Sequence, residues 1–403
     1  MNILFLTILK IDTLEDRGVY PDLMRQFHKE GHNVFIVTSI ERRFRQNTTL
    51  SAGEAVKILK IRTLNFQKTN ILEKWVATLL VNYQYSKAIK RFFPQVRFDL
   101  ILYSTPPITF TRLVDRLKKK NKSVSYLLLK DIFPQNAVDL GMIRRGGLFH
   151  KYLRRQEKKL YEVSDYIGCM SQANVDFVKR NNPEIAEEKV EINPNSHELF
   201  DECISDEEKK RIRLSHNIPE STTLFIYGGN LGKPQGINFI IDFLAAQKNN
   251  PEVFIVIIGS GTEYKRLKSW FDYEEPENEI LLSELPKVEY NKLLQSGDVG
   301  MIFLDSRFTV PNFPSRLLSY LEYKLPVIAS TDINTDLGQT ITDNKLGLWS
   351  QSGDLNTLCQ NVNRLVRNGE LRQIMGLNGY NFFIQHYTVV TSYKIIMRHF
   401  DIV

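Results

Sequence analysis

Two series of short, almost wholly apolar segments alternate with amphipathic segments along this chain of 403 residues. The first series runs from residues 2–7 to residues 166–171, and the second runs from 223–229 to 325–330. Strands that are apolar on both sides are typical of a parallel sheet whose two faces are covered by helices. Because the pattern restarts after a polar stretch, we expect two similar doubly wound domains.

The domain boundaries follow from the same pattern. A chain of 403 residues exceeds what one hydrophobic core usually organises. We place the first domain at residues 1–200, the second at 217–387 and a polar linker at about 195–217. Residues 388–403 form one more amphipathic segment, and we expect this helix to cross back to the first domain. The predicted class is α/β, with two parallel-sheet domains that face a cleft.

The cysteine and histidine spacing argues against a metal site or a disulfide framework. The three cysteines are scattered without pair spacing, which fits a reducing cytoplasm. His28 and His32 are four residues apart, but Gly31 is expected to end the helix between them. The sequence contains no Asp-x-Asp triplet. We therefore expect neither a metal nor another cofactor.

Basic residues are concentrated in the first half of the chain. Residues 1–200 contain 33 Lys and Arg against 21 Asp and Glu. Such a surface attracts anions, such as a membrane leaflet, a phosphate-bearing lipid or a nucleic acid, although it is also compatible with a solvated surface that has no partner. A nucleic acid is the poorer candidate because the basic residues are not interleaved with a base-stacking module.

The segment 72–93 has the pattern of a helix that lies on a membrane. Basic residues follow its apolar stripe, which suits a lipid headgroup layer, whereas the alternative is a stripe that faces the protein core. No apolar run approaches the roughly 20 residues that a membrane-spanning helix needs. We therefore expect peripheral attachment. The stripe consists of Leu72, Trp75, Val76, Leu79, Leu80 and Tyr83, followed by Lys87, Lys90 and Arg91.

Two glycine-rich loops follow strands of the second domain, where ligands of open parallel sheets bind. They have the sequences YGGNLGKPQG, at 227–236, and IIGSGTEYKRL, at 257–267. Glycine lets a ligand approach the backbone closely, and the helix after Gly236 offers unpaired N–H groups to a phosphate. The alternatives are ordinary glycine turns and, for Glu263, a carboxylate that complements the helix dipole. The candidate residues are Gly229, Gly232, Gly259, Gly261 and Glu263.

A third loop ends at a helix whose first residues are Ser315 and Arg316. A fixed cation at a helix N-terminus opposes the helix dipole and costs a few tenths to about 1 kcal/mol. A bound diphosphate would remove that conflict, because the guanidinium and the helix N–H groups can both donate to it. The alternative is a surface arginine in a mildly poor position.

Four motifs in order resemble the nucleotide-binding domain of GT-B glycosyltransferases of the retaining family four. They are YGGNLGKPQG, IIGSGTEYKRL, SGDVGMIFL and PSRLLSYLEYKLPVIAS. The segments LYSTPPITF and LLLKDIFPQNAVDLGMI resemble the acceptor-side domain of the same enzymes, and EINPNSHE resembles their hinge-entry asparagine motif. The resemblance covers essentially the whole chain. It is strongest to bacterial enzymes of capsule and O-antigen synthesis, including N-acetyl-fucosaminyl transferases.

The resemblance implies two Rossmann-like domains and a hexosyltransferase that depends on a UDP-sugar. The donor would bind the second domain and a polyprenyl-diphosphate-linked acceptor the first, with transfer of an N-acetylated sugar on the cytoplasmic face of the membrane. The main task of the protein would be to stabilise charge on the departing diphosphate. The resemblance gives this role to Arg316, Lys233 and the helix N-termini.

The chain departs from the family pattern at several positions. Asn230 and Gln235 stand where many members carry arginine and lysine. The usual pair of glutamates eight residues apart is replaced by Pro311 and Ser319. Either Glu322, one helical turn on, substitutes as the ribose ligand, or that contact is lost.

Lys130 and Asp131 end the apolar segment YLLLKD of the first domain. An aspartate at a strand end can orient an acceptor hydroxyl or accept its proton, whereas the alternative is a helix N-cap. Two rival functions remain open on the same fold: a nucleotide-sugar epimerase and a catalytically silent subunit that binds a partner enzyme.

Overall fold

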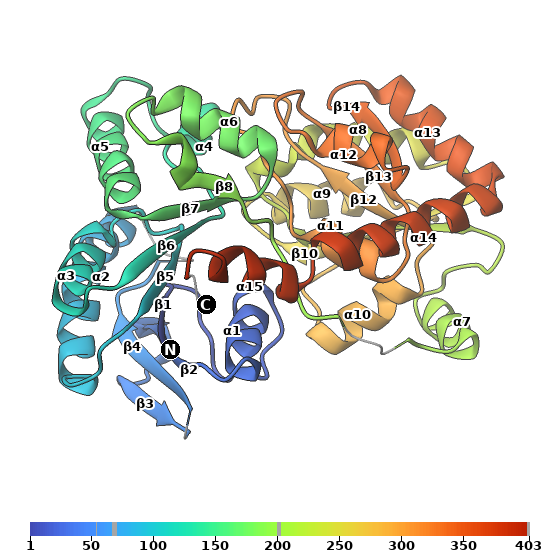
Figure 1. Cartoon of the computed structure of the whole chain (residues 1–403). Coiled ribbons are helices and arrows are strands. Elements are labelled where there is room, and N and C mark those ends of the chain that lie inside the picture. Colours follow the sequence, from blue (N-terminus) through green and yellow to red (C-terminus); the bar gives the residue numbers. More distant parts are fainter. Residues whose placement is uncertain (54, 67–70, 200–202, 401–403) are drawn as a thin grey trace. The chain divides into compact units, whose positions relative to one another are not determined.

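The computed structural model describes residues 1–53, 55–66, 71–199 and 203–400. The chain forms two compact units, one of Met1–Glu198 with Val389–Val403 and the other of Leu199–Thr388. Each unit has a central sheet with helices on both faces (Figure 1). The predicted α/β class with two parallel-sheet domains is confirmed.

The first unit contains an eight-stranded sheet in the order β3-β4-β2-β1-β5-β6-β7-β8. All neighbouring strands are parallel except β3 and β4, which form an antiparallel edge. The strands are β1 (Asn2–Leu6), β2 (Asn33–Glu41), β3 (Thr49–Ala52), β4 (Val56–Thr63), β5 (Leu100–Ser104), β6 (Val124–Leu129), β7 (Tyr166–Cys169) and β8 (Val190–Ile192). The helices are α1 (Val19–Lys29), α2 (Ile71–Phe92), α3 (Thr111–Asn121), α4 (Gln135–Asp139), α5 (Leu148–Val163), α6 (Gln172–Asn181) and α15 (Val389–Met397), with 3-10 turns at Arg42–Phe44 and Glu187–Lys189.

Helix α15 packs on α1, far from it in sequence, on one face of this sheet (Figure 1). The Tyr393 hydroxyl lies 3.0 Å from His32 Nε2, and the Tyr393 ring lies 5.0 Å from that of Phe27. The Ile396 side chain is fully buried in the core between α1 and the sheet. The last helix of the chain therefore completes the first unit. Residues 401–403 of the predicted C-terminal segment lie outside the described residues.

The second unit contains a six-stranded, wholly parallel sheet in the order β11-β10-β9-β12-β13-β14. The strands are β9 (Thr223–Asn230), β10 (Val253–Ser260), β11 (Glu279–Leu282), β12 (Val299–Phe303), β13 (Val327–Thr331) and β14 (Gly347–Gln351). The helices are α7 (Asp206–Ser215), α8 (Ile237–Gln247), α9 (Tyr264–Glu274), α10 (Lys287–Gln295), α11 (Arg316–Glu322), α12 (Leu337–Asp343), α13 (Leu355–Arg367) and α14 (Gly369–His386), with a 3-10 turn at Lys233–Gln235.

The register of β9 and β10 places their following loops side by side. The two strands pair along their whole length, and Gly229 stands opposite Gly259 in the pair before the last. Because every strand of this sheet is parallel, the loops after β9, β10 and β12 leave from the same edge. The three loops singled out in the sequence therefore lie at one edge of the second unit.

The apolar stripe of α2 is exposed, so the core-facing alternative is wrong for its described part. Val76, Leu79, Leu80 and Tyr83 are between 41% and 64% exposed. The face turned to the core instead carries residues one position away, and it is formed by Ala77, Val81, Tyr85 and Ala88. The side chains of Leu72 and Trp75 lie outside the described residues. In the described part of the chain, none of the helices has both the length and the apolar character needed to cross a bilayer.

Candidate active site

Arg316 is the first residue of α11, and its side chain reaches back to the end of β9. The guanidinium carbon lies 4.2 Å from the centroid of the Tyr227 ring, which is a cation–π distance. It also lies over Gly229, where an added Cβ would come within 3.5 Å of it. The Ser315 side chain makes no capping hydrogen bond. The predicted cation at a helix start is thus held by an aromatic ring at a strand end.

One nitrogen of this guanidinium is left without a partner. Arg316 Nη1 is buried and makes no hydrogen bond within the described residues. A buried donor that is left unpaired costs roughly 1–3 kcal/mol, and more when it is charged. Most buried polar atoms of proteins are paired, and among the described residues Arg316 Nη1 is one of twelve buried side-chain atoms without a hydrogen-bond partner. An anion at the end of β9 would supply an acceptor for this nitrogen.

The loop after β9 is held by its own side chains. Asn230 Nδ2 donates to Gln235 Oε1 over 3.0 Å, and the same oxygen accepts the Gly232 N–H at 3.0 Å. Gly229 has a φ of 125°, a conformation that side chains other than glycine rarely adopt. Asn230 and Gln235, which stand where many members of the resembled family carry arginine and lysine, therefore hydrogen-bond to each other and hold the loop in shape.

The glycines after β10 make room for backbone. A Cβ added to Gly259 would lie 1.8 Å from the Gly229 oxygen, and one added to Gly261 would lie 2.2 Å from the Leu231 oxygen. The sequence predicted that a ligand approaches the backbone at Gly259 and Gly261, but in the structure the backbone of the loop after β9 takes that space. A role of Gly259 and Gly261 in contacting a ligand stays a prediction.

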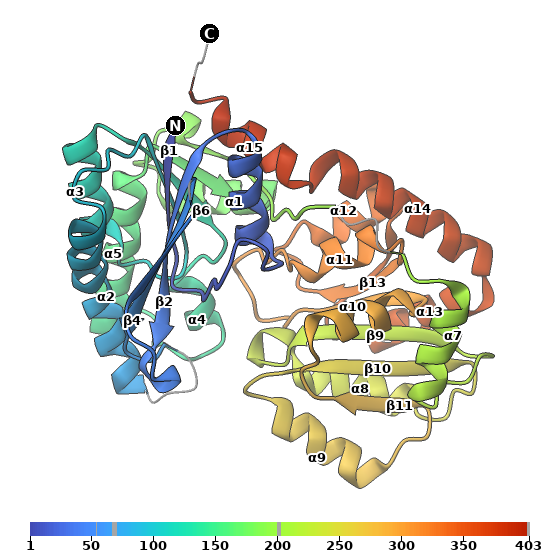
Figure 2. The same ribbon diagram turned by 90° about the horizontal axis from the view of Figure 1, so that it is seen from below.

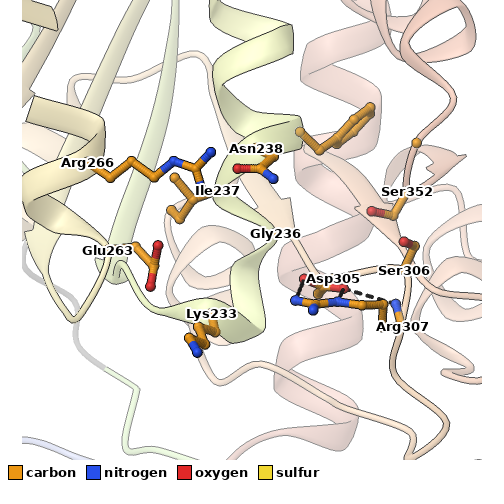
Figure 3. A pocket seen from close by; sticks show the side chains of 12 residues that line it. Lys233, Gly236, Ile237, Asn238, Glu263, Arg266, Asp305, Ser306, Arg307 and Ser352 are labelled. Atoms are coloured by element: carbon orange, nitrogen blue, oxygen red, sulfur yellow. Dashed lines mark hydrogen bonds and ion pairs between the residues drawn. The ribbon is translucent and has the colours of Figure 1, made fainter. Parts of the chain in front are cut away.

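A cavity of about 510 Å³ lies against the same loop, around the start of α8 (Figure 3). This volume is in the range of small-molecule sites. Lys233 and Glu263 are the two predicted side chains that line it, and Glu263 is the N-cap of α9. Arg316 is not among the lining residues, which are Lys233, Gly236, Ile237, Asn238, Phe239, Glu263, Arg266, Asp305, Ser306, Arg307, Ser352 and Gly353.

Sequence reasoning missed the charged residues that follow β12. Arg307 Nη2 and Nε lie 2.7 and 2.8 Å from the two oxygens of Asp305, so the pair is bidentate (Figure 3). The arginine is therefore already engaged, whereas Lys233 and Arg266 form no ion pair within the described residues. The available signal was position, because Asp305 stands directly after an apolar strand of the parallel sheet.

Two further predicted residues lie on α11. Glu322 is only 6% exposed, and Ser319 is half-buried. Neither residue lines the cavity. Their expected contact with a ribose stays a prediction, and for Glu322 it would require a carboxylate that is turned to the interior to become accessible.

In the first unit, Lys130 and Asp131 are held by Thr105. The Thr105 hydroxyl accepts the N–H groups of Lys130 at 3.2 Å and Asp131 at 3.1 Å and donates to the Asp131 carbonyl at 3.0 Å. Lys130 Nζ donates to the Asn193 carbonyl at 3.1 Å. The N-cap alternative for Asp131 is wrong, because α4 begins at Gln135 and its N-cap is Pro134.

Burial shifts the pKa values of this pair toward neutrality. Desolvation by the surrounding protein lowers the pKa of Lys130 to about 7 and raises the pKa of Asp131 to about 6, although Asp131 as a whole residue is exposed. Groups with such pKa values can exchange protons with substrates near neutral pH. Across the described residues, no group of three or more His, Cys, Asp or Glu is arranged to hold a metal ion.

Residues 208–382 match the family described as Glycosyl transferases group 1. The chain is a glycosyltransferase of the GT-B type. This matched segment contains β9 to β14 and the whole edge at which Arg316 lies. The unpaired guanidinium therefore lies within the segment that matches the family.

Two bacterial proteins similar to this glycosyltransferase are themselves named glycosyltransferases, one of them of colanic acid biosynthesis. The probable glycosyltransferase WbjE of Pseudomonas aeruginosa is 22% identical over 289 residues, which cover 70% of this chain and 69% of the relative. The putative colanic acid biosynthesis glycosyl transferase WcaI of Escherichia coli K12 is 23% identical over 265 residues, which cover 63% and 64% of the two chains.

Solved structures of similar fold cover nearly the whole chain. Sucrose-phosphate synthase of Thermosynechococcus elongatus has a TM-score of 0.75 at 15% identity and covers 99% of this chain and 98% of its own. Anabaena Alr3699/HepE, solved in complex with UDP-glucose, has a TM-score of 0.70 at 14% identity with full coverage of both chains. At these identities the similarity establishes the fold alone.

Proposed function

We propose that this enzyme is a retaining glycosyltransferase that moves an N-acetylated sugar from a UDP carrier to a polyprenyl-diphosphate-linked acceptor. The pathway would be bacterial surface polysaccharide synthesis of the capsule or O-antigen kind. The observation that carries the proposal is Arg316, whose buried Nη1 lacks a partner at the end of β9. A nucleoside diphosphate has the negative oxygens that such a donor needs.

The role of Arg316 follows from the chemistry of the leaving group. The bond between the sugar carbon and the diphosphate oxygen breaks, and negative charge develops on that oxygen. A fixed guanidinium beside it stabilises this charge more in the transition state than in the bound donor, which is what accelerates the step. The Tyr227 ring, 4.2 Å away, fixes the guanidinium before the donor arrives. The UDP and UDP-glucose complexes of the similar Anabaena structure support this choice of donor.

The acceptor hydroxyl forms its new bond on the face of the sugar that the leaving group vacates, so the configuration is retained. Its proton passes to the departing diphosphate oxygen. In this scheme Asp131 orients the acceptor hydroxyl, because Asp131 is an exposed residue whose carboxylate has no hydrogen-bond partner within the described residues. Lys130 anchors the same strand end through Asn193.

A lipid-linked acceptor requires contact with a membrane, and the outer helices of the first unit have a suitable surface. Helix α3 contacts both α2 and α5, and the three helices cover the face of the sheet opposite α1 and α15 (Figure 2). Leu148 and Tyr152 on α5 are 88% and 40% exposed, and they add to the exposed stripe of α2. These residues would enter the headgroup layer of an anionic leaflet.

The charge of this surface matches such a leaflet. Among the described residues of the three helices, Glu162 is the fully exposed acidic residue, whereas ten basic residues are exposed. Each basic residue near an anionic surface contributes about 1 kcal/mol of attraction. The ten residues are Lys87, Lys90, Arg91, Arg112, Arg116, Lys119, Lys120, Lys151, Arg155 and Lys159.

Thermal unfolding with nucleotides tests the donor assignment. UDP is expected to raise the unfolding temperature of the wild type more than GDP or TDP does, and Arg316→Ala is expected to lose most of that shift. Arg211→Ala is the matched control, because this arginine of the same unit lies on the exposed helix α7. Equal shifts in the wild type and Arg316→Ala would refute the assignment. Transfer from UDP-sugar to a lipid acceptor, absent when UDP-sugar is given alone, distinguishes the transferase from an epimerase.

A further inference from the structure

Three tyrosines, Tyr227, Tyr290 and Tyr320, lie close enough to the Arg316 guanidinium to interact with it electrostatically. The hydroxyls of Tyr227 and Tyr320 are hydrogen-bonded within the protein. The Tyr227 hydroxyl donates to the Asn230 carbonyl over 2.7 Å. The Tyr320 hydroxyl donates to the Met301 carbonyl over 3.0 Å and accepts the Gly228 N–H at 3.3 Å. The hydroxyl groups of these two side chains therefore stabilise the protein backbone around them.

The third tyrosine, Tyr290, has no hydrogen-bond partner for its hydroxyl within the described part of the chain. It is the fourth residue of α10, and its ring is half-buried beside Gly228. A Cβ added to Gly228 would lie 2.2 Å from the Tyr290 hydroxyl oxygen. Glycine at position 228 thus leaves the space into which this hydroxyl points.

The free hydroxyl and the guanidinium approach neighbouring residues at the end of β9, from the two opposite sides to which successive strand residues point. Tyr290 stands over Gly228 and Arg316 over Gly229. Burial raises the pKa of Tyr290 to about 12, so its hydroxyl keeps the proton at neutral pH and can donate it to a hydrogen bond. A guanidinium has donors alone. Two donors without an acceptor near the end of one strand suit the several oxygens of a diphosphate that lies across that end.

We propose that Tyr290 is a donor-binding residue whose hydroxyl donates a hydrogen bond to the diphosphate held by Arg316. The inference rests on the proposed function, since it assigns a second ligand to the same diphosphate. The Tyr290 hydroxyl would orient the diphosphate through a neutral hydrogen bond, whereas the Arg316 guanidinium would neutralise part of its charge. Together they would fix the diphosphate at the end of β9, beside Gly228 and Gly229.

Calorimetric titration with UDP tests the proposal on the full chain. Tyr290→Phe removes the hydroxyl and leaves the ring, and it is expected to weaken UDP binding roughly 10-fold to 100-fold, the range for a hydrogen bond to a charged group. Its unfolding temperature should match the wild type, because no partner inside the protein is lost. Tyr320→Phe is the matched control and should show the opposite pattern, with a lower unfolding temperature and a smaller change in UDP affinity.

Two further variants separate the proposal from indirect effects. In Arg316→Lys with Tyr290→Phe, the two losses of UDP affinity should be less than additive, because both side chains bind one diphosphate. Gly228→Ala should displace the Tyr290 hydroxyl and weaken UDP binding in the wild type, with little further loss in Tyr290→Phe. Unchanged UDP affinity in Tyr290→Phe, or strictly additive losses, would overturn the role of Tyr290 while leaving the donor site intact. A wild type that binds none of UDP, GDP and TDP would overturn the proposed function and this role together.

Discussion

Replacing one buried carboxyl group should change how the stability of the second unit depends on pH. Glu279 begins the edge strand β11, is 2% exposed, and neither of its carboxyl oxygens has a hydrogen-bond partner within the described residues. Burial raises its pKa from the ordinary value of 4.5 to about 8, against a smaller opposing effect of Lys248. The group is therefore protonated in the folded protein at neutral pH and ionised in the unfolded chain.

The sign of the effect follows from this difference in pKa. Below pH 4.5 both states bind the proton, so Glu279 contributes its full stability there. Between pH 4.5 and about 8 only the folded state keeps the proton, and the free energy of unfolding falls by about 1.4 kcal/mol for each unit of pH. At pH 7 the accumulated loss is about 3 kcal/mol, which is a large part of the stability of a typical domain.

Glu279→Gln should abolish this part of the pH dependence. Urea unfolding of wild type and variant, followed at pH 5 and pH 7.5 by the fluorescence of Trp270 and Trp349, measures it. The wild type should lose about 3 kcal/mol more than the variant between the two pH values. Glu277→Gln, two residues earlier and exposed, is the control and should follow the wild type. Parallel pH dependences of wild type and Glu279→Gln would refute the reasoning.

Two other perturbations test the first unit. The double variant Leu79→Glu with Tyr83→Glu should reduce sedimentation with vesicles of anionic lipid at least 10-fold, because two carboxylates would enter the headgroup layer. Tyr273→Glu, at a still more exposed position of the second unit, should leave sedimentation unchanged, and equal binding of both variants would contradict the docking surface. Asp131→Asn should lower the rate of sugar transfer. In the wild type the rate should fall below pH 6 because Asp131 becomes protonated, and the variant should lack this fall. A variant whose rate falls at low pH as in the wild type would exclude Asp131 from the step.

The strands and their parallel pairing were predictable because a strand that is buried on both faces appears in the sequence as a continuous apolar segment. β1 reads NILFL, and its last four residues are buried. The edge at which a site forms then follows from topology, since every strand of the second sheet points the same way. The position of Arg316 at a helix start was predictable for the same reason, because the turn residues before it and the apolar period after it are local signals.

The contacts of that arginine were not predictable, because they join residues that are far apart in sequence. Tyr227 precedes Arg316 by 89 positions, and nothing local indicates that its ring lies under the guanidinium. The apolar stripe of α2 shows a related limit. Its period predicts a helix, but the side turned to the core depends on how the helix docks, and here the core takes Ala77 and Val81 while Leu79 and Tyr83 face outward. Glycines have the same ambiguity, since Gly259 accommodates a neighbouring backbone where a ligand was expected.

A crystal structure of the full chain with UDP would test the central claim most directly. The account predicts a diphosphate oxygen within hydrogen-bonding distance of Arg316 Nη1, above the turn at Gly229. A diphosphate bound elsewhere, such as in the cavity beside Lys233 with Arg316 Nη1 still unpaired, would contradict it.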